Sequence, residues 1–353
     1  MNRGGYADSY GAAMEILEVR QMLADMFQAE SPQNVIFTPS LTYSLNMLLL
    51  GFLRKNDHVI TTSMEHNAVM RPLRALFKNG VSYDLAPCDK NGLLNAADII
   101  PLIRKETKAV VMLHASNVCG TIMPIEAAAE ICKKNKLRLI VDAAQTAGIL
   151  DIDAREIDAL AFAGHKGLLG PQGLGGFIIK KDFADEVAPL ITGGTGSLSS
   201  ESEQPDFLPD KFESGTINIP AIFGLKKAIE YINSTGMKTI YAKETALISA
   251  FISKVRGIDG VDIIGREDAA ERVPVVSLDF AGRDNAVVSA ALDGSHGIMA
   301  RCGLHCAPMA HKTLDTYPHG TVRFSFGHFN TMDDVEYVVR SIKEILKSAS
   351  YGF

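Results

Sequence analysis

Short runs of apolar residues alternate with longer amphipathic stretches over the first two-thirds of the chain. The short runs have the length of buried strands, and we expect strands at residues 58–62, 82–86, 109–116, 137–144, 159–164 and 175–180. Apolar positions at helical spacing predict helices at 67–79, 96–106 and 125–135. This alternation predicts a mostly parallel sheet with helices on both faces.

The pattern changes near residue 225. A long helical stretch over 225–258 is followed by strands at "VDIIG", "VPVVSLDF" and "TVRFSFG" and by a closing helix at 333–348. Polar positions alternate along these strands, which is typical of a sheet covered by helices on one face. We therefore expect a large α/β domain over residues 1–228 and a smaller C-terminal α+β domain over residues 229–353.

Composition and charge narrow the function classes. The chain is 47% hydrophobic and carries a net charge of -6, so it can bury a large core and lacks the basic excess of a nucleic-acid-binding protein. The longest apolar runs, such as residues 45–53, are too short to span a bilayer, and residues 1–11 lack a signal-peptide core. Five scattered cysteines indicate reduced thiols. We expect a cytoplasmic protein without membrane or nucleic-acid partners.

Polar residues follow the expected strands at the edge where such sheets bind ligands. They are Asn117, Asp142, Gln145, His165 and Lys166. Simpler interpretations exist for each: Asp142 could cap a helix, Asn117 could occupy a turn, and Lys166 could lie in a solvated glycine-rich loop. Together, however, they would converge on one cleft.

This convergent set has a chemical interpretation. A lysine amine at a desolvated strand end has a lowered pKa and can bind a carbonyl compound covalently. If that compound is pyridoxal phosphate, its ring nitrogen needs a carboxylate, which Asp142 supplies. Asn117 and Gln145 can hydrogen-bond the phenolic oxygen, and His66 can stack on the ring.

The phosphate of such a cofactor would bind at the start of an apolar helix, where backbone amides point outward. Ser40 and Thr42 precede or begin this helix in "FTPSLTYSLN", and His165 can add a donor. The glycines after Lys166 let the backbone pass close to the cofactor.

Seven motifs carry a family resemblance that covers nearly the whole chain. They are "EHNAVMRP", "HASNVCGTIMPI", "VDAAQTAG", "GHKGLLGPQG", "FESGTINIPAIFGL", "RCGLHCAP" and "VRFSFGHFNT". In this order they resemble the cysteine desulfurase and selenocysteine lyase family, within the class V aminotransferase superfamily of fold-type-I pyridoxal phosphate enzymes. The resemblance implies a seven-stranded-type sheet flanked by helices.

For the cofactor, the resemblance implies that Lys166 is the covalent anchor and a catalytic base. It also implies that Asp142 pairs with the ring nitrogen and Gln145 with the phenolic oxygen. His66 is implied to stack on the ring as a further catalytic residue, and Asn117 to lie near the phenolic oxygen or the substrate.

For the phosphate, the resemblance implies Thr42, the Leu41 amide and His165 as ligands. Thr216 matches a residue that reaches the phosphate of the partner subunit, which implies a homodimer with shared active sites. Ala163 stands where the family usually has a hydroxyl, so one phosphate donor is absent.

For the substrate, Arg323 matches the arginine that binds the substrate carboxylate, a task suited to its forked donors. Cys306 matches the sulfur-accepting nucleophile of the branch with a short cysteine loop. Arg301 and His305 stand beside it in the motif and could lower the pKa of its thiol, and Arg301 is also expected to bind the substrate. Cys306 could instead be a buried structural cysteine. Cys302, the loop's second cysteine, could join a disulfide with Cys306, or a metal site with His305, Cys306 and His311, although that spacing fits no common zinc pattern. We expect no metal.

The resemblance implies conversion of L-cysteine to L-alanine, with sulfur passing to Cys306 and then to an acceptor protein. Three alternatives remain open at this stage: a selenocysteine lyase or another C–S or C–Se lyase, a class V aminotransferase, and a degenerate homologue without activity. The family's opening "LDNAAT"-type strand has no counterpart before "NRGGYADSYG", so we expect a large domain shortened at its N-terminus.

Overall fold

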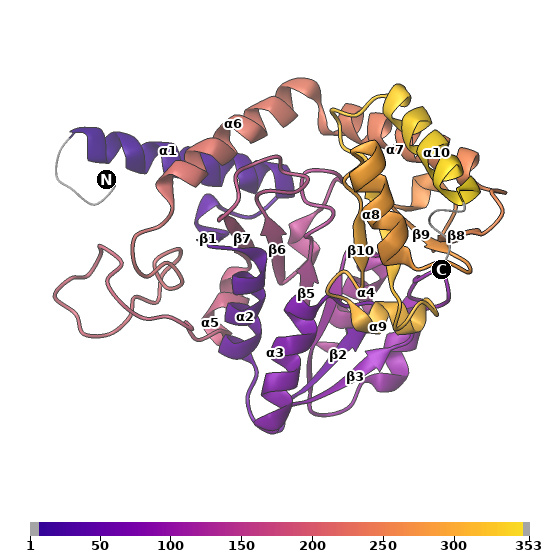
Figure 1. The fold of residues 1–353 in the computed structure, drawn as a ribbon. Helices are drawn as coiled ribbons and strands as arrows, with labels where there is room; N and C mark the ends of the chain where they lie inside the picture. Colours follow the sequence, from indigo (N-terminus) through magenta and orange to yellow (C-terminus); the bar gives the residue numbers. More distant parts are fainter. Residues whose placement is uncertain (1–6, 349–353) are drawn as a thin grey trace.

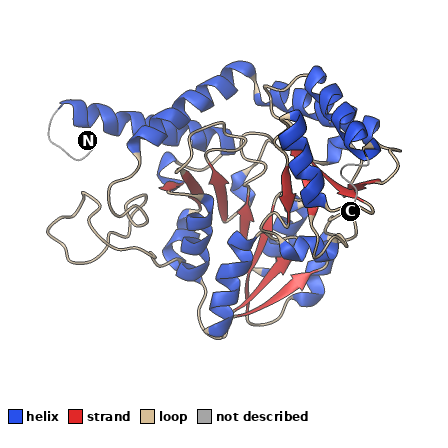
Figure 2. Cartoon of the chain, viewed as in Figure 1, coloured by secondary structure: helices blue, strands red, loops and turns tan. Residues whose placement is uncertain are grey.

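The structure, a computed structural model, describes residues 7–348. Two sheets organise it: a seven-stranded sheet in the order β1-β7-β6-β5-β4-β2-β3 and a four-stranded sheet in the order β10-β11-β9-β8. The two sheets lie side by side, with helices packed around each (Figures 1 and 2). The Met1 start on which the expectation of a shortened N-terminus rests lies outside the described residues.

The large sheet confirms the predicted α/β class. Its strands are β1 (Val35–Thr38), β2 (His58–Thr62), β3 (Ser82–Ala86), β4 (Thr107–Leu113), β5 (Arg138–Asp142), β6 (Ala159–Ala163) and β7 (Gly175–Ile179). Strands β6, β5, β4, β2 and β3 are parallel, whereas β7 runs antiparallel to both β6 and β1. All six predicted strands are present, although β4 begins at 107 and ends at 113 rather than spanning 109–116.

The prediction missed β1, for a physical reason. The strand is only four residues long, and its place in the sheet depends on pairing with β7 about 140 residues later, from Val35 with Ile178 to Thr38 with Gly175. Such a long-range antiparallel pair leaves no periodic signal in a four-residue segment.

Helices cover both faces of the large sheet. They are α1 (Ala7–Phe27), α2 (Leu41–Phe52), α3 (Asn67–Lys78), α4 (Ile125–Asn135), α5 (Lys181–Glu186) and α6 (Ile219–Thr235), with short 3-10 turns at Pro32–Asn34 and Ala154–Glu156. Helices α1, α4 and α6 contribute to one core, whereas α2, α3 and α5 contribute to the other. The helix expected at 96–106 is wrong: residues Ala96–Leu102 form a 3-10 helix, because Pro101 removes an amide donor from the segment.

The smaller sheet is antiparallel throughout and is covered on one face by helices, as predicted. Its strands are β8 (Val261–Ile264), β9 (Val275–Phe280), β10 (Arg301–Gly303) and β11 (Thr321–Ser325). Around it lie α7 (Met237–Val255), α8 (Asn285–His296), α9 (Pro308–Thr313), α10 (Met332–Lys347) and the 3-10 turn Ala269–Glu271. Alternate residues of β9 and β11, including Val276, Leu278, Val322 and Phe324, form its helix-covered core. The three-residue β10 was not predicted.

The long helix expected over 225–258 is two helices. It breaks at Gly236, whose φ of 90° is incompatible with an α-helix. The expected domain boundary after residue 228 falls inside α6, which packs against α1, and the division at 228 stays a prediction. Among residues 7–348, no helix combines the length and the apolar character that crossing a membrane requires.

Candidate active site

A cavity of about 200 Å³ opens at the carboxyl ends of the parallel strands, where the sequence predicted the site. Nine predicted residues line it: Ser40, Leu41, Thr42, His66, Asn117, Asp142, Gln145, His165 and Lys166. They come from the segments that follow β1, β2, β4, β5 and β6. The tertiary structure therefore brings together side chains that are spread over more than one hundred residues of sequence.

Asp142 and Lys166 supply the charged groups of this cavity. Asp142 ends β5, is 4% exposed, and its Oδ1 accepts a hydrogen bond of 2.9 Å from the Ala144 amide. It therefore caps the local turn, and no helix follows it, whereas its role toward a cofactor stays a prediction. Burial raises the pKa of Asp142, and the nearby Lys166 opposes that shift.

Lys166 lies in the glycine-rich turn after β6 and keeps exposed surface along the cavity. The surrounding protein atoms displace water and lower the pKa of its amine; Asp142 opposes the shift, and Arg323 and Arg301 add to it. A lysine with a lowered pKa beside a carboxylate suits covalent binding of a carbonyl cofactor. Gly167 follows directly, and a Cβ there would lie 2.6 Å from the Ala147 carbonyl oxygen.

His66 begins α3 as its N-cap. Its Nδ1 accepts a 3.0 Å hydrogen bond from the Ala68 amide, which leaves the proton of the neutral ring on Nε2. Burial, aided by Lys166, lowers the pKa of His66 to about 4, so the ring is neutral at physiological pH. A neutral imidazole fixed as a helix cap is able to stack on a flat ring, and that role of His66 stays a prediction.

The twelve-residue helix α2 presents its N-terminus to the cavity. Ser40 is the N-cap, Leu41 is the first helical residue, and Thr42 is exposed. Gly175 of β7 packs directly behind this turn, and a Cβ there would lie 2.6 Å from the Leu41 amide nitrogen. Free amides at the start of a helix and a hydroxyl make a suitable phosphate site.

Cys306 lies outside the cavity lining, on the loop that follows β10, and its side chain is exposed. This excludes the alternative of a buried structural cysteine. The Sγ of Cys306 lies 3.6 Å from Nη2 of Arg301. His305 is 2% exposed, and its Nε2 already pairs with the Thr321 hydroxyl at 3.0 Å. Burial lowers the pKa of His305 to about 3.

Hydrogen bonds join the cysteine loop to the cavity. The side-chain amide of Asn117 donates to the His305 carbonyl at 2.8 Å, and Nη1 of Arg323 donates to the Asn117 carbonyl at 2.9 Å. The Oδ1 of Asn117 and the Nε of Arg323 are buried without a hydrogen-bond partner in the described part of the chain. Buried polar atoms normally have partners, so these two fit a bound polar ligand.

Two predicted features lie elsewhere. Thr216 is exposed and lines a separate cavity of about 260 Å³, with Tyr43, Met47 and Ile191 among its walls. Cys302 pairs with Val322 across the sheet, whereas Arg301 pairs with Arg323. Paired residues share a face, so Cys302 lies on the face opposite Arg301, which argues against a disulfide with Cys306. Within residues 7–348, no cluster of three or more ligating side chains could hold a metal.

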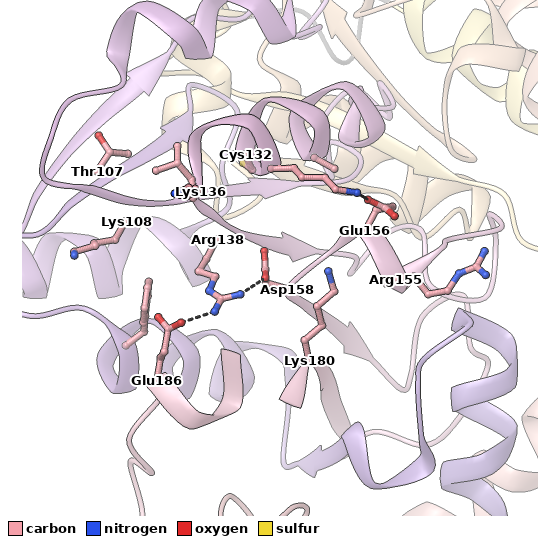
Figure 3. A pocket seen from close by; sticks show the side chains of 14 residues that line it. Thr107, Lys108, Cys132, Lys136, Arg138, Arg155, Glu156, Asp158, Lys180 and Glu186 are labelled. Carbon is pink, nitrogen blue, oxygen red and sulfur yellow. Dashed lines mark hydrogen bonds and ion pairs between the residues drawn. The ribbon is translucent and has the colours of Figure 1, made fainter. Parts of the chain in front are cut away.

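A larger hollow of about 540 Å³ lies at the opposite edge of the sheet (Figure 3). Thr107 and Arg138 of its lining begin β4 and β5, so it opens at the amino ends of the parallel strands. Arg138 pairs with Asp158 at 2.8 Å and with Glu186, and Lys133 pairs with Glu156 at 3.3 Å. None of the predicted site residues lines it, and its ion pairs serve the packing of α4, α5 and β5.

The sequence did not single out three apolar walls of the site, Leu113, Ala115 and Ala144. Ala163, which the resemblance placed beside the phosphate, also lines the cavity. Leu113 and Ala115 follow the two-residue period at the end of β4, which could have indicated them. Glu65 was also missed. It is 0% exposed, accepts hydrogen bonds from Thr62 Oγ1 (2.6 Å) and the Leu113 amide (3.1 Å), and adjoins His66 in sequence.

The fold and this site together define a pyridoxal-phosphate-dependent enzyme. A family model for aminotransferase class-V matches residues 2–338. The chain belongs to the class-V aminotransferase family, whose members depend on pyridoxal phosphate, and within it to the cysteine desulfurases.

The similarity to individual proteins extends over nearly the whole chain. A "probable cysteine desulfurase" of Methanothermobacter thermautotrophicus is 31% identical over 350 residues, covering 97% of this chain and 86% of that protein. One from Pyrococcus abyssi is 33% identical, covering 99% and 87%. The apo structure of a cysteine desulfurase from Thermococcus onnurineus NA1 superposes with a TM-score of 0.91 at 32% identity, covering 98% of this chain and 87% of that one.

Proposed function

We propose that this protein is a cysteine desulfurase that converts L-cysteine to L-alanine and keeps the sulfur as a persulfide on Cys306. One observation carries the proposal. An exposed thiol beside a guanidinium lies on a loop that is hydrogen-bonded, through Asn117, to a cavity containing a lysine and a buried carboxylate.

The residues of the cavity fit pyridoxal phosphate. Lys166 would bind it covalently, Asp142 would face its ring nitrogen, and the amides and hydroxyl at the start of α2 would hold its phosphate. When bound, the cofactor supplies an electron sink that makes the substrate Cα–H and Cβ–S bonds easier to break. Lys166, whose pKa is lowered, would carry the proton between Cα and its own amine.

Arg323 and Asn117 would orient the substrate. The unpartnered Nε of Arg323 can bind the carboxylate of L-cysteine, and the unpartnered Oδ1 of Asn117 can accept from an amine or hydroxyl. The Cys306 sulfur then attacks the substrate sulfur: an S–S bond forms, the Cβ–S bond breaks, and a proton replaces sulfur on Cβ. L-cysteine plus the enzyme thiol thereby gives L-alanine plus the enzyme persulfide, and atoms and electrons balance.

The test compares alanine formation from L-cysteine by the wild-type protein and by Cys306→Ala, with excess cofactor and a reducing thiol. Cys302→Ala is the matched control, because Cys302 lies on the face of β10 opposite Arg301, the partner of the Cys306 thiol. We expect alanine from the wild type and the control only. Equal alanine formation by Cys306→Ala would refute the persulfide role, and a strong preference for L-selenocysteine would instead identify a selenocysteine lyase.

We further propose a cytoplasmic homodimer that passes sulfur to an acceptor protein. Thr216 is exposed and lines a cavity apart from Lys166, which supports the proposal that it serves the partner subunit. Mixing Lys166→Ala and Thr216→Val chains tests this. Shared sites would leave the mixed dimer with one site that has lost both residues and one that is intact, so activity should return on mixing.

A further inference from the structure

The segment at 117–122, between β4 and α4, is bonded almost residue by residue to the part of the chain that carries the small sheet. The carbonyl oxygens of residues 117, 118, 119 and 120 accept hydrogen bonds, in order, from Arg323 Nη1 (2.9 Å), Ser277 Oγ (2.6 Å), Arg272 Nη2 (2.6 Å) and the Val273 amide (2.9 Å). The Ile122 amide donates to the Glu271 carbonyl at 3.2 Å. We call this set of contacts the intersheet seam.

Arg272 is the central residue of the intersheet seam. It is 0% exposed, and its guanidinium donates to the carbonyls of Cys119, Val275 (2.7 Å) and Arg266. It therefore ties one backbone segment beside the large sheet to two beside the small sheet. A buried guanidinium is tolerated only when its donors are satisfied, so these carbonyls must keep their positions.

Two glycines leave no room for the seam to slide. A Cβ on Gly120, whose φ is +77°, would lie 2.6 Å from the Val275 carbonyl oxygen. A Cβ on Gly265, whose φ is +88°, would lie 2.6 Å from the Cys119 Cβ. Gly120 meets backbone and Gly265 meets the Cys119 side chain at this closeness, so a relative shift of the two sheets would create clashes or break the hydrogen bonds.

The seam ends at the groups that would react. Asn117 is both its first residue and a wall of the Lys166 cavity, and its side chain holds the carbonyl of His305, the residue before Cys306. We propose that the intersheet seam sets the distance between the Cys306 thiol and the Lys166 cavity. Arg272 and Ser277 are then positioning residues for sulfur transfer. This inference rests on the proposed desulfurase function.

Two reactions separate positioning of the thiol from the rest of the chemistry. Exchange of the Cα proton of L-alanine for deuterium needs the cofactor and Lys166 but no thiol. Alanine formation from L-cysteine needs the thiol as well. A misplacement of about 1 Å can cost about 100-fold in rate, so a loosened seam should slow the second reaction far more than the first.

The experiment uses holoenzyme carrying Arg272→Met, with Arg283→Met as control. Arg283 donates to the Leu346 carbonyl at 2.7 Å, away from the seam. We expect Arg272→Met to lose about 10- to 100-fold in kcat for L-cysteine, with kcat for L-alanine exchange within about twofold of wild type. Arg283→Met should change neither of these two kcat values. A proportional loss of both activities, or no loss, would overturn the proposal.

Hydrogen–deuterium exchange of the apoprotein supplies a readout independent of activity. Arg272→Met should speed amide exchange in residues 117–122 and 303–307 together, and Arg283→Met should speed it in neither segment. Faster exchange confined to 117–122 would contradict the proposed coupling between the intersheet seam and the cysteine loop. If Arg272→Met does not fold, the same measurements are made on Ser277→Ala, with Ser341→Ala as the control because the Ser341 hydroxyl donates to Tyr337 within α10. A wild type that makes no alanine would reject the desulfurase function, while the exchange result would still report on the seam.

Discussion

The guanidinium of Arg301 and the thiol of Cys306 are held beside each other, with Nη2 3.6 Å from Sγ. Arg301 begins β10, and the loop after this strand turns back because His305 and Cys306 both have positive φ values, 48° and 58°. Such values are uncommon for residues other than glycine, and the turn they produce directs the exposed thiol toward the guanidinium.

Arg301 should therefore assist the attack by sulfur. A donor at this distance stabilises negative charge on the sulfur, and hydrogen bonds to charged groups are worth about 1.5–3 kcal/mol. We expect Arg301→Met to slow single-turnover persulfide formation by about tenfold or more. Arg340→Met, on the exposed surface of α10, is the control. An unchanged single-turnover rate in Arg301→Met would show that this contact has no part in sulfur transfer.

Lys166 and Lys180 distinguish the cavities at the two edges of the large sheet, since Lys166 lines the one at the carboxyl ends of the strands and Lys180 lines the hollow at the opposite edge. We expect Lys166→Ala to abolish alanine formation and the visible absorbance of covalently bound cofactor, with little change in Tm because this side chain is exposed. Lys180→Ala should keep both signals. Loss of cofactor absorbance in Lys180→Ala would contradict this assignment, because it would indicate that the cofactor binds at the amino ends of the strands.

Glu65 should make stability depend on pH. Burial raises its pKa from 4.5 to about 8, so the folded protein binds this proton more tightly than the unfolded chain. Its contribution to the free energy of unfolding is therefore fully present below about pH 4.5 and is lost as the pH rises through 8. The size of this contribution is on the order of a few kcal/mol. Glu65→Gln keeps an acceptor oxygen but cannot titrate.

The measurement is urea unfolding of wild type and Glu65→Gln from pH 5 to 9. We expect the variant to gain stability relative to wild type as the pH rises. Parallel pH curves for the two proteins would mean that Glu65 does not keep its proton in the folded state.

Gly175 should be irreplaceable because of what surrounds it. A Cβ there would meet the Leu41 amide at 2.6 Å and the Phe162 carbonyl at 2.9 Å, and neither backbone group can move away cheaply. We expect Gly175→Ala to lower stability by about 1–3 kcal/mol and to weaken cofactor binding at the start of α2. Gly294→Ala, in α8 with nothing within 4 Å, should instead be neutral or stabilising. Thermal unfolding and cofactor titration check both.

Much of the fold was readable because its signals are local. The strands at residues 58–62 and 82–86 and the helix at 125–135 have the predicted bounds, since burial imposes its period directly on the sequence. Side chains after the strands, such as Asp142 and Lys166, could be placed at one edge because parallel strands end together. Strand β1 and the break at Gly236 escaped prediction because they depend on a distant partner and on one residue's φ.

The amino-acid sequence by itself determined the α/β class, the family and nine of the residues that line the Lys166 cavity, because periodicity, strand ends and motifs depend on neighbouring positions. Only the tertiary structure decided that Cys306 is exposed and that Cys302 faces away from Arg301. It also decided that Arg272 joins the two sheets through a contact 153 residues away in sequence. Such relationships arise from the packing of distant segments, which no local pattern records.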